Sequence, residues 1–280
     1  MSPNPIRLVS DEEIETFKAD GIVCLRGIFD AQWVEEIRAL VEADMRTPSG
    51  MVKNINAQGA SGYFFGDTFV CHHLEGFQRA VFESPAPQLM AALFGANKVN
   101  LLFDQILVKE PRTSTPTLWH QDVTYWPVAG EQVATLWLAL DPVTRETGAV
   151  EYLRGSHLWQ QRYLAVSFDP AQRYEEDLPE VPDIEAARDQ YDIVCFDLEP
   201  GDCTIHDARL LHGAPPNSSP TARRRAYLQR WTGDDVTYNP RANLQRMLRD
   251  PGIAPGSAMD CDLFPVAWPS RSTTPADARS

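Results

Sequence analysis

From residue 98 onward the chain is a succession of short strand-like runs, each ended by proline, glycine or aspartate. In the first run, apolar residues such as Val99, Leu101 and Phe103 recur at every second position, a period typical of β-strands. Further runs of strand-forming residues cover 133–140, 148–153, 192–196, 203–206 and 225–231. The regular alternation of strands and helices that marks parallel sheets is absent. The sequence therefore predicts a mainly β protein, with a β-sandwich or jelly roll as its core.

Short helices are expected before these strands. Ser10 and Glu13 have the spacing of a capping box, and Gly21 would end the first helix. Asp30 is a favourable cap for a second helix, in which apolar residues recur at helical spacing. A third short helix is expected at residues 87–94, which begin with a proline. The β core should therefore carry N-terminal and flanking helices.

The 280 residues are expected to form one domain, 1–280, with a large core. We divide it into a helical N-terminal part at 8–97 and a jelly-roll core at 98–232. Residues 160–190 are polar, acidic and interrupted by prolines, which predicts an insertion over one end of the sheet. Residues 233–280 are rich in proline, arginine, aspartate and serine and are expected to form a C-terminal arm.

Charge and cysteine content narrow the possible partners. A formal net charge of −14 makes nucleic acid or an anionic membrane surface an unfavourable general partner, because both attract basic patches. No run approaches the ~20 apolar residues of a transmembrane helix, and we expect a cytoplasmic protein. The five cysteines are odd in number and scattered, so neither a disulfide framework nor a zinc ribbon is indicated. The sequence leaves the oligomeric state open.

Two histidines and one aspartate form the main candidate site. His120 and Asp122 are two positions apart, so in an extended segment their side chains project to the same side. His212 follows much later, before a glycine and a proline-rich loop. Two histidines and one carboxylate can bind non-haem Fe(II) and leave coordination positions open. The arginines at 223–225 could then hold a dicarboxylate cosubstrate.

Several ordered motifs resemble the phytanoyl-CoA dioxygenase family, whose members are Fe(II)- and 2-oxoglutarate-dependent oxygenases. The resemblance extends over most of residues 10–235. It rests on these motifs: Asp20-Gly21-Ile22-Val23, Trp119-His120-Gln121-Asp122, Trp137-Leu138-Ala139-Leu140-Asp141, Gly155-Ser156-His157, Pro200-Gly201-Asp202 and His212-Gly213-Ala214-Pro215-Pro216-Asn217. It implies a double-stranded β-helix core of the cupin-like type. It also implies that His120, Asp122 and His212 are the iron ligands.

The resemblance further implies which residues hold 2-oxoglutarate. An arginine shortly after the distal histidine would bind the far carboxylate, with Gln105 and Trp137 beside the cosubstrate. Spacing from the distal histidine selects Arg223, whereas strand register selects Arg224. We favour Arg224, because a loop absorbs an inserted residue more readily than a strand absorbs a change of face. Arg223 remains the alternative.

The expected reaction consumes O2 and 2-oxoglutarate, releases succinate and CO2, and oxidises a C–H bond of a small-molecule substrate. The retained carboxylate ligand, Asp122, favours hydroxylation over halogenation. Ala214 stands where some members of the family have a serine that bonds the cosubstrate, and Thr135 could supply that hydroxyl instead. Trp126 and Tyr125 are candidates for the wall of the substrate pocket.

Two other functions stay open at this point. The same three ligands could serve a metal-dependent cupin-type enzyme that needs no 2-oxoglutarate. The chain could also be a binding homologue without turnover. The identity of the substrate, whether acyl-CoA or a free metabolite, is not encoded in any motif that we recognise.

Overall fold

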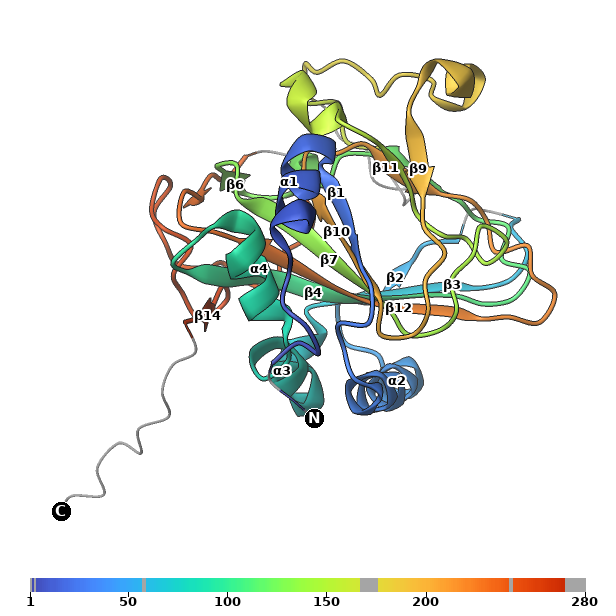
Figure 1. The fold of residues 1–280 in the computed structure, drawn as a ribbon, viewed down its shortest axis with the longest axis horizontal. Coiled ribbons are helices and arrows are strands. Elements are labelled where there is room, and N and C mark those ends of the chain that lie inside the picture. The colour runs from blue at the N-terminus through green and yellow to red at the C-terminus, as the bar shows by residue number, and fades with distance from the viewer. Residues whose placement is uncertain (1, 3, 57–58, 167–175, 242–243, 270–280) are drawn as a thin grey trace.

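Two facing β-sheets form the centre of the molecule in the computed structural model, which describes residues 2, 4–56, 59–166, 176–241 and 244–269 (Figure 1). Pairing within the sheets is antiparallel. The predicted mainly β class is confirmed.

The larger sheet has eight strands, and the smaller sheet faces its inner side with four. In spatial order, the larger sheet consists of β1 (Ile22–Leu25), β10 (Cys203–Asp207), β7 (Val133–Ala139), β12 (Arg224–Thr232), β4 (Val99–Lys109), β3 (Phe64–Thr68) and β2 (Lys53–Asn54), with β14 (Val266–Trp268) also paired to β4. The smaller sheet consists of β5 (Thr117–His120), β11 (His212–Ala214), β8 (Glu151–Leu153) and β9 (Ile193–Cys195). A separate pair joins β6 (Val128–Ala129) to β13 (Thr237–Tyr238).

Four α-helices precede the β4 strand: α1 (Asp11–Asp20), α2 (Ala31–Arg46), α3 (Glu75–Phe82) and α4 (Ala86–Phe94). The capping box predicted at the start of α1 is present, because the Ser10 side chain and the Glu13 carboxylate each accept a backbone N–H of the other. Asp30 caps α2 through a bond from the Trp33 N–H, as expected. The sequence did not predict α3. Short 3-10 helices lie at η1 (Val70–His72), η2 (Asp122–Tyr125), η3 (Ser156–Trp159) and η4 (Glu185–Gln190).

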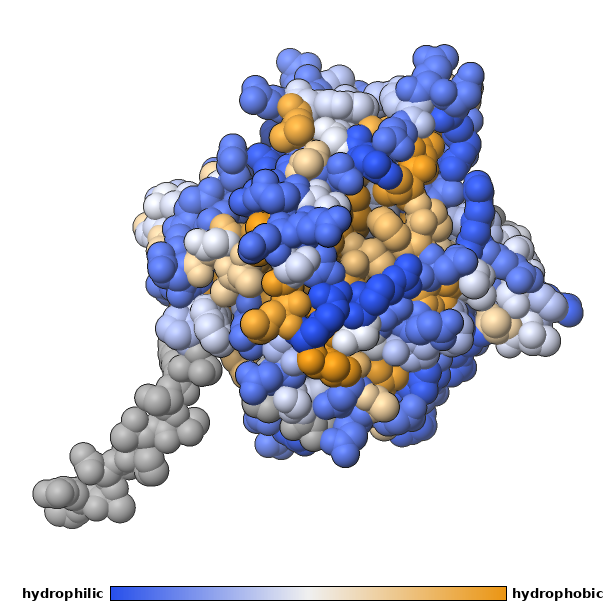
Figure 2. Space-filling view, viewed as in Figure 1, coloured by the Kyte–Doolittle hydropathy of each residue, from blue (hydrophilic) through white to orange (hydrophobic). Residues whose placement is uncertain are grey.

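The two faces of the larger sheet have different roles. On β7, Leu136 and Leu138 point outward and join the main hydrophobic core with residues of all four α-helices. Thr135 and Trp137, which alternate with them, point inward and line a cavity between the sheets. The helices in Figure 1 accordingly lie on the outer side of this sheet. The face shown in Figure 2 is largely hydrophilic, in keeping with the high charge of the chain.

The segments outside the core contribute to both sheets. The N-terminal part supplies β1, β2 and β3 as well as helices. In the predicted insertion, η4 lies against the smaller sheet, where Glu185 accepts a bond from the Trp119 indole N–H (2.7 Å). The predicted C-terminal arm adds β13 and β14. Residues 167–175 and 270–280 lie outside the described part, and the domain boundaries remain predictions.

Candidate active site

The three predicted metal ligands come together at the edge where the smaller sheet faces the cavity. His120 ends β5, His212 begins β11, and the two residues are direct partners in the strand pairing. Asp122 begins η2, two positions after His120. One ligand atom from each side chain lies within 4.8 Å of the others, and all three residues are buried. The Asp122 Oδ1 atom is 3.6 Å from His120 Nε2 and 3.9 Å from His212 Nε2.

Backbone carbonyls fix how the two imidazoles present themselves. His120 Nδ1 lies 2.7 Å from the Leu118 carbonyl oxygen, and His212 Nδ1 lies 2.9 Å from that of Leu210. A carbonyl oxygen only accepts, so each Nδ1 must carry a proton, and in the neutral form of each ring Nε2 then holds the lone pair. Burial, followed by the charges of His120 and His206, holds the pKa of His212 well below its usual range. The two Nε2 atoms are therefore the ones that can bind a metal.

Two neighbours hold the second oxygen of the Asp122 carboxylate. The Thr135 hydroxyl donates to Asp122 Oδ2 at 2.7 Å, and His206 Nε2 lies 3.4 Å from the same oxygen. Oδ1 is left facing the two ligand imidazoles. Burial alone would raise the pKa of Asp122, but the neighbouring His120 and His206 side chains, followed by the charges of His212 and Arg230, hold it well below its usual range. The sequence suggested Thr135 as a contact of the cosubstrate; in the structure its hydroxyl bonds the carboxylate of Asp122, a predicted metal ligand.

A cavity of about 740 Å³ opens from this cluster between the two sheets. Its size is suited to a small-molecule ligand together with a cosubstrate. Tyr125 and Trp126, the predicted pocket residues, both line it. The Tyr125 hydroxyl is held by the backbone of Val166, donating to its oxygen at 2.7 Å. Trp126 packs edge-on against Phe103, with ring centroids 5.6 Å apart.

Arg224 lines the same cavity from strand β12. Its side chain is only 1% exposed, its Nε has no hydrogen-bond partner within the described residues, and no carboxylate there lies within ion-pair distance. The guanidinium carbon lies 5.4 Å from the centre of the Trp137 ring. Burial lowers the pKa of Arg224 to about 10, so the side chain remains a cation at neutral pH. Such a buried, unpaired guanidinium is suited to an anionic ligand.

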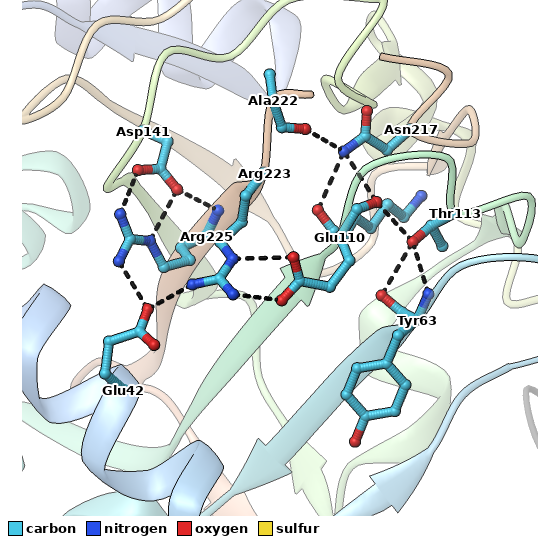
Figure 3. Close-up of polar contacts among 10 residues, drawn as sticks. Glu42, Tyr63, Glu110, Thr113, Asp141, Asn217, Ala222, Arg223 and Arg225 are labelled. Carbon is cyan, nitrogen blue, oxygen red and sulfur yellow. Dashed lines mark hydrogen bonds and ion pairs between the residues drawn. The ribbon is translucent and has the colours of Figure 1, made fainter. Parts of the chain in front are cut away.

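Arg223 and Arg225 occupy a different environment, which Figure 3 shows. Arg223 forms ion pairs with Glu42 (2.6 Å) and Glu110 (2.7 Å). Arg225 pairs with Asp141 (2.6 Å) and with the same Glu42 on α2 (2.9 Å). Neither arginine lines the cavity. Of the two arginines between which the sequence left the choice open, Arg224 is therefore the one with access to a cosubstrate.

Gln105 and Trp137 also line the cavity, from the two strands that flank β12. The Gln105 Oε1 accepts a bond from Arg230 Nη2 at 2.6 Å. Sequence reasoning missed Arg230, although it lies at an even spacing from Arg224 on one strand and so shares its face. It also missed Lys53, which lines the cavity from β2. Ala214 lies in the wall, as expected, and brings no hydroxyl.

The residues present fit an Fe(II) ion and a dicarboxylate. Two imidazoles and one carboxylate on one face form the donor set typical of non-haem iron, with room on the cavity side for further ligands. The unpaired Arg224 in the same cavity fits the far end of 2-oxoglutarate. Within the described residues, no helix combines the length and apolar character needed to cross a bilayer.

Comparison with known proteins agrees with this site. The pattern that defines the phytanoyl-CoA dioxygenase family matches residues 17–226. The chain belongs to the phytanoyl-CoA dioxygenase family. Its sequence is 26% identical over 234 residues to the multifunctional dioxygenase prhA of Penicillium brasilianum, covering 79% of this chain and 72% of that one.

Solved structures of similar shape support the fold. The non-haem α-ketoglutarate-dependent carbocyclase SnoK from nogalamycin biosynthesis has a TM-score of 0.73 at 24% identity, covering 95% of this chain and 99% of SnoK. The epimerase SnoN from the same biosynthesis has a TM-score of 0.73 at 22% identity, covering 92% and 98% of the two chains. SnoN has also been solved with Fe3+, α-ketoglutarate and nogalamycin RO. The cupin-like fold expected from the sequence is confirmed.

Family membership and the His–Asp–His cluster together identify the protein as an Fe(II)- and 2-oxoglutarate-dependent dioxygenase. The family and its reaction, which the sequence motifs predicted, are thereby confirmed. The role of each residue in the cavity remains a proposal.

Proposed function

We propose that this dioxygenase hydroxylates a C–H bond of a small molecule, with iron held by His120, Asp122 and His212 and 2-oxoglutarate anchored by Arg224. The observation that carries this proposal is that the metal cluster and an unpaired, buried arginine line one cavity. A cupin-type metal enzyme without a dicarboxylate cosubstrate would have no ligand for that arginine. A silent binding homologue would not need three ligands in this arrangement.

Each protein group has a defined part in this function. His120 and His212 offer fixed Nε2 lone pairs, and Asp122 offers Oδ1 while Thr135 holds its other oxygen. Bound iron and 2-oxoglutarate, with O2, would supply the oxidising power, releasing succinate and CO2. Arg224 would bind the far carboxylate through a charge-assisted pair, and Trp137 would limit the movement of its guanidinium. Gln105, held by Arg230, would present its amide N–H groups to the cavity.

The pocket walls would exclude water from the reacting centre. Tyr125 and Trp126 stand beside the ligands, and the His120 and Tyr125 ring centroids are 5.8 Å apart. Removing water from such a centre strengthens its electrostatic interactions and prevents side reactions. We propose that these two aromatic side chains contact the substrate. A cytoplasmic location and the absence of nucleic-acid partners remain predictions from the sequence.

The test follows succinate and oxygen. Purified protein is first titrated with Fe(II) and 2-oxoglutarate without O2, and the charge-transfer absorption of the ternary complex is recorded. Candidate substrates are then screened for stimulated succinate release, and products formed under 18O2 are analysed by mass spectrometry. Hydroxylation predicts one labelled oxygen atom in the product. Fe(II)-dependent succinate release with an unlabelled product would replace hydroxylation by another oxidation, and no succinate under any condition would refute the dioxygenase.

A further inference from the structure

A second buried arginine lines the cavity at a distance from Arg224. The Arg230 side chain is 6% exposed, and its Nε and Nη1 have no hydrogen-bond partner in the part of the chain that the structure describes. Its remaining nitrogen, Nη2, donates to Gln105, and its guanidinium carbon lies 4.9 Å from the centre of the Phe103 ring. Burial lowers the pKa of Arg230 to about 10, which leaves it charged at neutral pH. A buried charge with unmet donors is costly unless a ligand meets them.

The strand register places Arg230 at the metal end of the cavity. It lies six positions beyond Arg224 on β12, with both side chains on the inner face. At about 3.3 Å per residue, the two backbone positions are roughly 20 Å apart along the strand. Arg230 pairs directly with Thr135, the residue that bonds the metal carboxylate. One dicarboxylate that reaches from Arg224 to the metal would therefore leave Arg230 on the far side of the metal.

A lysine accompanies Arg230 at the mouth of the cavity. Lys53 lies on β2 and lines the same space. Desolvation, followed by the positive charge of Arg230, lowers the pKa of Lys53. Neither side chain has a carboxylate partner within ion-pair distance among the described residues, although Arg230 is buried and Lys53 is exposed to solvent. Two like charges thus share one wall of the cavity.

In the loaded centre, the metal and cosubstrate groups leave the charges of Arg230 and Lys53 unmatched, together with that of the exposed Arg246, which also lines the cavity. Fe(II) and Arg224 bring three positive charges, and Asp122 and 2-oxoglutarate bring three negative charges. Asp122 is the only carboxylate among the described residues that line the cavity. After both cofactor and cosubstrate are bound, no carboxylate of the described cavity lining is therefore left for Arg230 and Lys53, and the buried Asp104, which attracts Arg230, lies beyond ion-pair distance. The acidic surface does not cancel them, because charges beyond a Debye length of about 8 Å are largely screened at physiological salt.

We infer that the substrate of the proposed dioxygenase carries a carboxylate, which Arg230 and Lys53 bind while the carbon to be oxidised lies at the metal. The apolar part of the substrate would contact Phe103, Trp126 and Met51, which line the same region. The anion would direct the molecule in one orientation, because the cosubstrate would occupy Arg224, whereas Arg230 lies beyond the metal. This inference rests on the proposed function and narrows its substrates to apolar carboxylic acids.

The test uses matched pairs of probes that differ only in charge. Hexanoate, 4-phenylbutyrate and naphthalene-2-acetate are each compared with the corresponding carboxamide. Binding to protein loaded with Fe(II) and 2-oxoglutarate is measured by calorimetry without O2. We expect at least one acid to bind about tenfold to a hundredfold more tightly than its amide, as a charge-assisted hydrogen bond implies. Equal affinities within every pair, or no binding by any acid, would overturn the inference.

Variants separate this site from general charge effects. Lys53→Met and Arg230→Met should weaken binding of the acid about tenfold or more and leave the amide unchanged, whereas Arg230→Lys should restore part of the difference. Lys18→Met removes the same charge from the exposed side of α1, where Lys18 pairs with Glu15, and should change nothing. An equal loss for acid and amide in Lys53→Met would show that the lysine only shapes the cavity.

The anaerobic absorption of the Fe(II)–2-oxoglutarate complex distinguishes the two proposals. Among the described residues, Lys53 forms no hydrogen bond with a proposed metal ligand or with Gln105, so Lys53→Met should keep that absorption while losing preference for the acid. If the absorption never forms in the wild type, the proposed function fails. If it forms and the acids gain nothing over the amides, only the carboxylate inference fails.

Discussion

The arginines on the two faces of the larger sheet differ in whether they form ion pairs. On the outer side, Arg225 and the neighbouring Arg223 are paired with the carboxylates of Glu42, Glu110 and Asp141 (Figure 3). On the inner side, Arg224 and Arg230 are more deeply buried, yet neither has a carboxylate partner within the described residues. One residue type on one strand thus has two environments that alternate with the pleat.

The difference distinguishes arginines that stabilise the fold through ion pairs from arginines that are suited to bind a ligand. A buried charge is stable only when paired, so an unpaired one indicates a partner that the chain does not itself supply. Ion pairs of the outer face are complete without any ligand. Substitutions on the inner face should therefore change binding and turnover, and substitutions on the outer face should change stability.

The largest effect is expected for the metal carboxylate. Asp122→Ala removes one of three ligands and should weaken Fe(II) binding by more than about a hundredfold, with loss of substrate-coupled succinate. Asp104→Asn is the matched change on the outer side, where the buried carboxylate accepts the Tyr227 hydroxyl at 2.8 Å. It should lower stability and keep Fe(II) binding. Calorimetric Fe(II) titrations of both variants test this, and full coupled turnover in Asp122→Ala would refute the ligand assignment.

The next largest effect should distinguish the two candidate cosubstrate anchors. Arg224→Met should raise the 2-oxoglutarate KM by about a hundredfold or more, because it removes a buried charged partner of the dicarboxylate. Arg223→Met should leave that KM within about threefold, because its side chain faces Glu42 and Glu110. Steady-state succinate assays at varied 2-oxoglutarate measure both values. The reverse result would show that strand register chose the wrong arginine.

A smaller effect on Fe(II) affinity is expected for Thr135, which contacts the proposed metal ligand Asp122. Thr135→Val removes the hydroxyl that holds Asp122 Oδ2 and should weaken Fe(II) binding about tenfold. Thr135→Ser keeps the hydroxyl and should bind Fe(II) nearly as the wild type does. If Thr135→Val instead raised only the 2-oxoglutarate KM, the threonine would act on the cosubstrate, as the sequence first suggested.

Local signals predicted much of this molecule, and their absence explains what was missed. The capping residues of α1 and α2 are visible in the sequence, whereas the N-cap residue of α3, Leu74, makes no side-chain cap bond and so gave no starting signal. The two-residue period placed Arg224 on the cavity side of its strand. Motif spacing could not show that Arg230 and Lys53 share a wall, because Lys53 reaches it through pairing of distant strands.

The smallest effect on 2-oxoglutarate binding is expected for Arg225, the outer-face arginine that bonds both oxygens of one carboxylate. Arg225 donates through Nε and Nη2 to the two oxygens of Asp141 at 2.9 and 2.6 Å, and through Nη1 to Glu42. Arg225→Met leaves the largely buried Asp141 without a close cation: it keeps the backbone N–H of residue 225 at 2.9 Å and a distant contact to Arg38 at 3.7 Å. We expect the free energy of unfolding to fall by about 1–3 kcal/mol. Urea denaturation measures this loss. Arg223→Met is the control: the partners of Arg223 are more exposed, so this variant should lose less than about 1 kcal/mol.

The kinetics of Arg225→Met test whether the two faces of the sheet act separately. Since Arg225 does not line the cavity, the 2-oxoglutarate KM of the variant should stay at the wild-type value. A large rise in that KM would mean that the two faces of the sheet are coupled.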